Sequence, residues 1–267
     1  MKKKIAVIGY GALSKIFLDL FKIHLVNDYD INGILIKNQD KRNDAISLGY
    51  NTYGNLEELF LDKPDYVAEF ASASAIKEYS IEILNKGINL IIVSVGALED
   101  ENFYKEIKNA AINSGAEIFV ASGAIGGFDL MRTFALDSSA QAKIQTSKSP
   151  KSWDGAPYLE NITLSKSNKE IIFQGNAKEA IKGFPKNVNV AVATSIAVSG
   201  VENTQVELIS VPEAKGNTHK ISLESQVAKA TIEITAKKDL NNPKSSVITA
   251  WSVVALLKNL VDVVKFF

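Results

Sequence analysis

The sequence contains no cysteine, and its only histidines are His24 and His219. The absence of cysteine excludes disulfides, thiolate metal sites and cysteine nucleophiles. Two histidines are too few for a histidine-based zinc site, so we expect no metal centre. A chain without cysteine suits a reducing compartment, and we expect a cytoplasmic protein.

The chain also lacks net charge and long apolar segments. Its 30 basic and 30 acidic residues cancel, so no overall field attracts nucleic acid or anionic lipid. The apolar run at residues 88–98 is interrupted by Asn89 and Ser94 and is too short to span a bilayer. With 267 residues, 46% of them hydrophobic, the chain can bury one large core or two ordinary ones. We expect a globular protein that acts on a small molecule, with no membrane segment, signal peptide or nucleic-acid partner.

The first half alternates short apolar runs with helical spacing. The runs cover residues 4–8, 31–36, 66–70, 90–95 and 117–121, and helical stretches such as 75–84 and 101–114 separate them. Near-continuous apolar strands that alternate with helices predict a parallel sheet covered on both faces. This half is therefore expected to form a Rossmann-type α/β domain.

The second half has a different pattern. Residues 161–173, 204–211, 219–225 and 228–235 are predicted strands with partial alternation and fewer helices between them. Residues 146–157 resemble a polar loop, to which we assign no chemistry. The pattern predicts an α+β domain on an open, mixed and mainly antiparallel sheet.

The domain boundary is expected where three glycines, Gly123, Gly126 and Gly127, follow a strand. Residues 245–267 have apolar residues at helical spacing, including Trp251 and Val264, and are predicted to pack back on the first domain. We therefore expect a dinucleotide-binding domain at residues 1–122, joined by 244–267, and a substrate domain at 123–243.

A glycine-rich turn follows the first predicted strand. Residues 9–14, Gly-Tyr-Gly-Ala-Leu-Ser, match G-x-G-x-x-G except that Ser14 replaces the third glycine. Such a turn brings backbone N–H groups and a helix N-terminus to a pyrophosphate. A plain glycine turn is the alternative, but the strand–turn–helix context favours a dinucleotide. We expect Gly9, Gly11, Ala12 and Leu13 to bind the coenzyme.

The end of the second predicted strand lacks the acidic residue typical of NAD selectivity. Lys37 and Asn38 stand there instead. A carboxylate would bind the ribose 2′-hydroxyl of NAD, whereas Lys37 can neutralise the 2′-phosphate of NADP. An ordinary exposed lysine is an equal alternative, so the coenzyme is predicted as NAD or NADP.

Histidine is the natural acid–base residue for an enzyme that moves protons near neutral pH. His24 ends the first predicted helix and is expected to cap or pack there. His219 lies in a polar loop before a predicted strand, a better place for chemistry. Its position alone also fits an ordinary histidine at the surface end of a strand.

Several segments, in order and across nearly the whole chain, resemble the L-aspartate dehydrogenase family. The interdomain segment and the Pro-Lys-Asn-x-Asn-Val-Ala segment are much more specific than the first turn. The segments are residues 9–12 (Gly-Tyr-Gly-Ala), 122–129 (Ser-Gly-Ala-Ile-Gly-Gly-Phe-Asp), 184–191 (Phe-Pro-Lys-Asn-Val-Asn-Val-Ala), 217–219 (Asn-Thr-His) and 242–246 (Asn-Pro-Lys-Ser-Ser).

The resemblance implies roles for particular residues. Ala124 and Asn189 match positions that contact the nicotinamide coenzyme, and His219 matches the family's catalytic histidine. Without the resemblance, a turn or cap would be the simpler account of Asn189. Three polar residues near the C-terminus are further candidates to bind substrate carboxylates or coenzyme, although a helix cap explains Ser245 equally well. They are Lys244, Ser245 and Ser246.

The implied reaction is the oxidation of L-aspartate by NAD(P)⁺ to iminoaspartate, which water converts to oxaloacetate and ammonia. The resemblance further implies a homodimer and delivery of the imine to NAD biosynthesis. One alternative is a two-domain enzyme of the homoserine dehydrogenase or dihydrodipicolinate reductase kind. Another is a protein that senses NAD(P)H without turnover, which would need the glycine turn but not His219.

Overall fold

The computed structural model describes residues 1–185, 187, 189–237 and 246–266. The chain divides into two compact units, which are described separately. Unit 1 comprises Met1–Ala121 and Thr249–Phe266, and unit 2 comprises Ser122–Ile248. None of the helices in the described ranges is long and apolar enough to cross a membrane.

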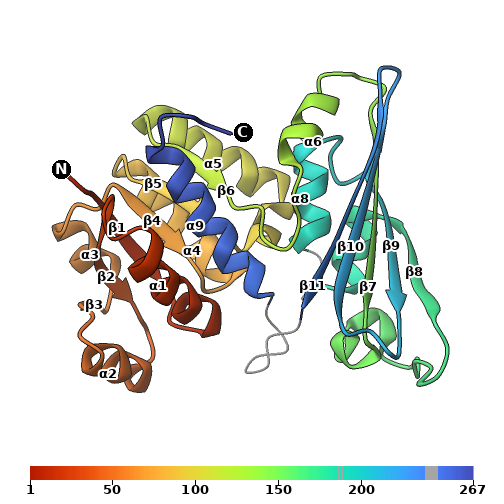
Figure 1. Ribbon diagram of the computed structural model, residues 1–267, viewed down its shortest axis with the longest axis horizontal. Helices are drawn as coiled ribbons and strands as arrows, with labels where there is room; N and C mark the ends of the chain where they lie inside the picture. The colour runs from red at the N-terminus through yellow and green to blue at the C-terminus, as the bar shows by residue number, and fades with distance from the viewer. Residues whose placement is uncertain (186, 188, 238–245, 267) are drawn as a thin grey trace. The chain divides into compact units, whose positions relative to one another are not determined.

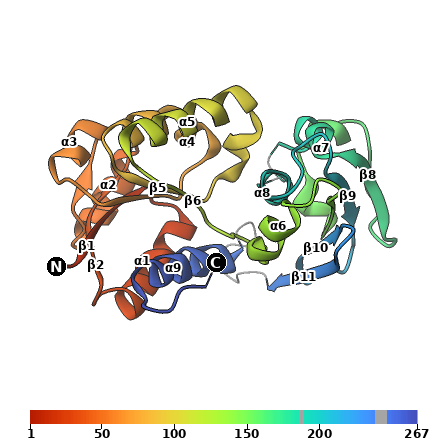
Figure 2. The same ribbon diagram turned by 90° about the horizontal axis from the view of Figure 1, so that it is seen from above.

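Unit 1 is a parallel sheet of six strands in the order β3-β2-β1-β4-β5-β6. Figure 2 shows α1 and α9 on one face of this sheet and α4 and α5 on the other. The elements are β1 (Lys3–Ile8), α1 (Ala12–His24), β2 (Tyr29–Leu35), α2 (Gln39–Ser47), β3 (Thr52–Tyr53), α3 (Leu56–Leu61), β4 (Tyr66–Glu69), α4 (Ala73–Asn85), β5 (Asn89–Ile92), the 3₁₀ turn η1 (Val95–Glu99), α5 (Glu101–Ser114), β6 (Ile118–Val120) and α9 (Val247–Val261).

Helix α9 is the C-terminal helix that the sequence predicts to return to the first domain. The Tyr29 hydroxyl donates a hydrogen bond of 2.8 Å to the carbonyl of Leu257. Apolar side chains of α9 join the core built on α1 and the sheet, namely Ala250, Val253, Val254 and Leu257. Trp251 and Val264, which were predicted on the packed face, are exposed because α9 turns a different stripe inward and ends at Val261.

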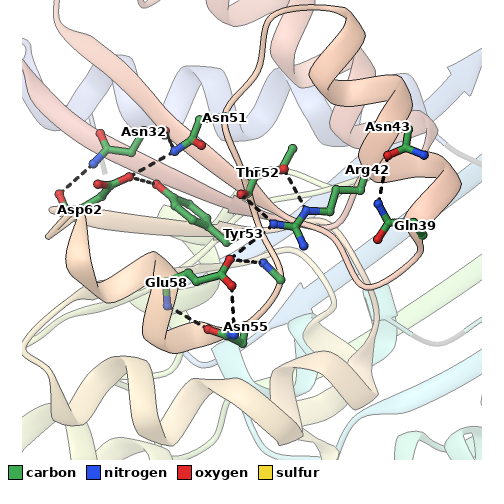
Figure 3. Close-up of polar contacts among 11 residues, drawn as sticks. Asn32, Gln39, Arg42, Asn43, Asn51, Thr52, Tyr53, Asn55, Glu58 and Asp62 are labelled. Atoms are coloured by element: carbon green, nitrogen blue, oxygen red, sulfur yellow. Dashed lines mark hydrogen bonds and ion pairs between the residues drawn. The ribbon is translucent and has the colours of Figure 1, made fainter.

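Strand β3 was not predicted, because two residues are too few to form a pattern. Polar contacts fix it at the edge of the sheet (Figure 3). Arg42 of α2 donates to the Thr52 hydroxyl and pairs with Glu58 of α3. The Tyr53 hydroxyl donates to the carboxylate of Asp62. These tertiary contacts place the segment between α2 and α3.

Unit 2 is a mixed sheet of five strands in the order β11-β10-β7-β9-β8, in which only the β7–β9 pair is parallel within the described ranges. Helices α6, α7 and α8 lie on one face of this sheet (Figures 1 and 2). The elements are α6 (Phe128–Phe134), β7 (Gln141–Lys148), the 3₁₀ turns η2 (Pro150–Trp153) and η3 (Pro157–Leu159), β8 (Glu170–Asn176), α7 (Ala177–Gly183), α8 (Asn189–Ala197), β9 (Gln205–Ser210), β10 (Gly216–Glu224) and β11 (Lys229–Lys237).

The structure confirms the fold class, an α/β unit with a parallel sheet followed by an α+β unit on a mixed sheet. The predictions for two segments of the unit 2 sheet are wrong. Residues 161–169 are not a strand, because the Ser165 hydroxyl accepts the N–H groups of Ser167 and Asn168 in a local turn. Strand β7 includes residues 146–148. These residues were predicted as loop because only alternate residues of the strand are buried, so the segment has no apolar run.

Candidate functional site

The glycine turn of unit 1 connects β1 to α1 as the sequence predicts. Gly9 has φ +96°, and a Cβ there would lie 2.9 Å from the carbonyl oxygen of Phe70. Gly11 is the N-cap of α1, which has no side-chain cap, and a Cβ on Gly11 would meet no atom within 4 Å. Glycine is therefore required at residue 9, while open space and uncapped N–H groups at Gly11, Ala12 and Leu13 suit an anionic group.

A pocket of about 360 Å³ opens beside this turn. Gly9 and Gly11 line it on one side, and Lys37 and Asn38 line it where β2 ends. Lys37 forms two 2.8 Å contacts with the carboxylate of Glu78, which also lines the pocket. This hydrogen bond raises the pKa of Lys37 and lowers that of Glu78. The pocket thus holds both a cation and a carboxylate, and the carboxylate comes from α4 instead of the end of β2.

Sequence reasoning missed Glu69, which is fully buried at the end of β4. Its carboxylate accepts hydrogen bonds from the N–H groups of Ala71, Val93 and Ser94 and from the Ser94 hydroxyl. Burial raises the pKa of Glu69, and these donors oppose that effect. The carboxylate ties the loop after β4, which lines the pocket, to the loop after β5. A glutamate at the end of an otherwise apolar run was the available signal.

In unit 2 the buried face of the sheet changes from apolar to polar at one end. Along β7 the buried side chains run from Ala142 and Ile144 to Thr146 and Lys148. His219 of β10 pairs with Thr146, and Ser210 of β9 pairs with Lys148. Paired residues on neighbouring strands share a face of the sheet. Three adjacent strands therefore place Thr146, Lys148, Ser210 and His219 together, and we call these four residues the polar cluster.

His219 lies inside β10 and is only 3% exposed, so it belongs to the strand, as in the predicted run 219–225, and its placement in a polar loop is wrong. The flanking strand continues through it because β7 and β11 pair with it on both sides. Its Nδ1 lies 3.0 Å from the Thr146 hydroxyl oxygen. Burial, with a further contribution from the positive charge of Lys148, lowers the pKa of His219 to about 3. The imidazole is therefore neutral near pH 7 and can accept a proton.

Lys148 is the residue that sequence reasoning passed over, since it was placed in a loop without chemistry. It is 9% exposed at the end of β7, and burial lowers its pKa to about 8. Its ammonium donates to the side-chain oxygen of Asn187 at 3.0 Å and lies 5.0 Å from the centre of the Trp153 ring. Asn187, of the family-like segment 184–191, is thereby placed beside the polar cluster.

The remaining predicted residues lie at several places. Ala124 is half-buried in the loop before α6, and Asn189 is exposed in the first turn of α8. Ser246 precedes α9, and its buried hydroxyl has no partner in the part of the chain that the structure describes. Lys244 and Ser245 lie outside the described residues. His24 packs against Trp251, with ring centres 5.6 Å apart, as expected for a helix-end histidine.

The burial of His219 predicts a dependence of stability on pH. Its pKa is lower in the folded protein than the ordinary value of 6.5, so the unfolded chain binds the proton first as the pH falls. Between pH 7 and pH 5 this costs the fold about 2 kcal/mol. Denaturant unfolding gives the free energy of unfolding at each pH. We expect the His219→Gln variant to lose about 2 kcal/mol less than the wild type between pH 7 and pH 5. His24→Gln is the control for removal of a histidine. Equal losses in His219→Gln and the wild type would contradict the assignment.

Together, a parallel sheet with a pocket beside its glycine turn and an α+β unit with a buried histidine are the features of a two-domain NAD(P)-dependent oxidoreductase. Residues 9–121 match the NAD-binding domain of homoserine dehydrogenase, and residues 129–260 match the C-terminal domain of aspartate dehydrogenase. An L-aspartate dehydrogenase of Acinetobacter baumannii is 31% identical over 98% of this chain and 99% of its own length. The chain belongs to the L-aspartate dehydrogenase family.

Other relatives agree with this placement. An L-aspartate dehydrogenase of Methanospirillum hungatei is 35% identical over 79% of this chain and 80% of its own length. The crystal structure of aspartate dehydrogenase from Thermotoga maritima matches with a TM-score of 0.78 and 28% identity, and covers 100% of both chains. A hyperthermophilic archaeal homoserine dehydrogenase in complex with NADPH, 14% identical with a TM-score of 0.62 and covering 96% of this chain and 97% of its own, shares the fold.

Proposed function

We propose that this protein oxidises L-aspartate with NAD⁺ or NADP⁺. Hydride leaves Cα of L-aspartate for the coenzyme and the amino group loses a proton, which gives iminoaspartate and NAD(P)H. Water then adds to the imine carbon and ammonia leaves, which gives oxaloacetate. The observation that carries the proposal is the buried, neutral His219, held by Thr146 in a chain of this family.

His219 is the residue that we propose to move protons. A neutral imidazole accepts a proton either from the substrate amino group or from the water that attacks the imine. The hydrogen bond to Thr146 fixes the ring plane, and among the described residues only Nδ1 of the ring has a hydrogen-bond partner. The other nitrogen, Nε2, is therefore the one that we propose faces the substrate.

The residues of unit 1 fit a dinucleotide. The required glycine at residue 9, the open space at Gly11 and the uncapped start of α1 form a cradle for a pyrophosphate. Lys37 and Glu78 line the same pocket, and we propose that they bind the ribose next to the pyrophosphate. When bound, the coenzyme supplies the hydride acceptor. By family resemblance we also assign nicotinamide contacts to Ala124 and Asn189, and substrate or coenzyme contacts to Lys244, Ser245 and Ser246.

A direct assay tests the proposal. L-aspartate is added to the enzyme with NAD⁺ or NADP⁺, and the absorbance of the reduced coenzyme is followed, with homoserine and other amino acids as controls. We expect reduction with L-aspartate and little with the others. Coenzyme binding without reduction by any substrate would overturn the proposal and favour a sensor, and reduction by homoserine alone would favour the homoserine dehydrogenase alternative.

The pair Lys37–Glu78 predicts how coenzyme choice responds to mutation. The lysine can neutralise a 2′-phosphate, and the carboxylate can accept the 2′-hydroxyl of NAD. We expect Lys37→Met to lower kcat/KM for NADP⁺ by about tenfold, with little change in kcat/KM for NAD⁺. We expect Glu78→Gln to raise the ratio of kcat/KM for NADP⁺ to kcat/KM for NAD⁺. Lys77→Met, on the same helix as Glu78, is the matched control. An unchanged ratio of the two coenzymes in both variants would contradict this role.

Three wider features are part of the proposal. The family resemblance implies a homodimeric state and the use of iminoaspartate in NAD biosynthesis, and the absence of cysteine is the ground for a cytoplasmic location. Light scattering on the purified protein tests the homodimeric state. The use of iminoaspartate depends on an enzyme that consumes the imine before water does, and a shortened lifetime of the imine in a coupled reaction would support it.

A further inference from the structure

Lys148 is a buried cation that pairs with no carboxylate in the part of the chain that the structure describes. Its ammonium contacts a neutral amide oxygen and an aromatic face, and no carboxylate of the described residues pairs with it. A buried charge without a counter-charge is costly in a protein interior. An apolar side chain at such a position would make the fold more stable, so a buried, unpaired cation indicates a functional role.

The surroundings of Lys148 offer further hydrogen-bond donors. Ser210, its neighbour in β9 on the same face, is fully buried, and its hydroxyl has no partner in the described part of the chain. Trp153, whose ring lies beside the ammonium, is likewise fully buried with its indole N–H unpartnered there. A cation with spare donors around it is the chemistry of an anion site.

We propose that Lys148 binds a carboxylate of the substrate in the polar cluster, with Asn187 holding the ammonium in place. The inference rests on the proposed function, because it takes the anion to be a carboxylate of L-aspartate. L-aspartate has two carboxylates, whereas its ammonium group needs a proton acceptor. In this proposal Lys148 neutralises the negative charge of a substrate carboxylate, and His219 accepts the proton.

The same pairing links binding to proton transfer. In the free enzyme burial is the main cause of the low pKa of His219, and the charge of Lys148 lowers that pKa further. A carboxylate on Lys148 cancels that charge, so the imidazole becomes a stronger base when substrate is bound. His219 is therefore a stronger base in the substrate complex than in the free enzyme.

The test is Lys148→Met, which keeps an unbranched side chain only one atom shorter and removes the charge. We expect KM for L-aspartate to rise about thirtyfold or more, KM for the coenzyme to stay the same, and the melting temperature to stay the same or rise. A residue with a structural role would lower the melting temperature instead. Lys148→Arg, which restores a cation, should recover part of the lost affinity. Lys220→Met, on the opposite face of β10 beside His219, is the matched control.

Equilibrium binding separates this inference from the proposed function. Succinate, a four-carbon dicarboxylate without an amino group, is titrated by calorimetry into the wild type and into each variant. We expect Lys148→Met to weaken succinate binding by a factor similar to its rise in KM, and Lys220→Met to leave it unchanged.

Each outcome decides one of the two claims. If the wild type binds succinate through Lys148 but does not oxidise L-aspartate, the proposed function fails and the anion site stands. If the wild type oxidises L-aspartate and Lys148→Met has a KM within about threefold of it, the anion site fails and the function stands. A fall in kcat with unchanged KM and unchanged succinate binding overturns the inference too, because Lys148 would then act in proton transfer.

Discussion

His219→Ala is expected to lower the turnover of L-aspartate by about a hundredfold or more while coenzyme affinity stays within about twofold. The reason is that the substitution removes the residue of unit 2 that we propose as the proton acceptor, and leaves intact the pocket of unit 1 where we propose that the coenzyme binds. Steady-state kinetics give the turnover, and fluorescence titration with reduced coenzyme gives the affinity.

Two further variants sharpen this result. His24→Ala removes the other histidine, which packs on Trp251, and should keep nearly full turnover. Thr146→Val removes the hydrogen bond to Nδ1 without removing the imidazole, so we expect a smaller loss, about tenfold. Near-normal turnover in His219→Ala would rule out the assignment, whatever the other variants do.

Glu69→Ala is expected to destabilise the protein by about 2–4 kcal/mol. The change leaves three backbone N–H groups and the Ser94 hydroxyl without their acceptor. The loop after β4 also lines the pocket where we propose that the coenzyme binds, so we expect KM for the coenzyme to rise about tenfold or more. Denaturant unfolding and coenzyme kinetics measure the two effects.

Glu69→Gln and Glu82→Ala are the companions of this variant. The glutamine keeps the size of the side chain but offers one acceptor oxygen and turns N–H donors toward backbone donors, so its loss should approach that of alanine. Glu82 is exposed on α4, and its replacement should change stability by less than about 0.5 kcal/mol. A Glu69→Ala protein as stable as Glu82→Ala would show that the four hydrogen bonds contribute nothing net.

The fold was largely predictable, because a parallel sheet covered on both faces leaves a simple mark in the sequence. Its strands β1, β2, β4, β5 and β6 overlap the runs predicted at residues 4–8, 31–36, 66–70, 90–95 and 117–121. Strand β7 left no such mark, since one of its faces carries polar side chains and the buried face itself becomes polar at Thr146 and Lys148. Strand β3 is held by side-chain contacts from α2 and α3, which no local pattern predicts.

The candidate site was predictable only in part. The glycine turn follows from its spacing, and the choice of His219 rests on family resemblance, because its residue type and position alone fit a surface histidine equally well. Lys148 and Glu69 became candidates only because the tertiary fold buries them. The Lys148 ammonium lies over the face of a tryptophan ring, and the Glu69 carboxylate accepts hydrogen bonds from backbone N–H groups. Glu78 replaces the acidic residue missing after β2, but it comes from another helix and only the fold brings it near Lys37.

The return of α9 to unit 1 gives the two units different requirements for folding. The residues of unit 2 form one continuous stretch, whereas the core of unit 1 needs Val253 and Leu257, which follow unit 2 in the sequence. Unit 1 therefore cannot complete its core from residues 1–121 alone, and the apolar surface around Tyr29 is covered only when α9 docks on it. A chain truncated before residue 249 would leave that surface exposed, so the docking of α9 protects unit 1 from aggregation.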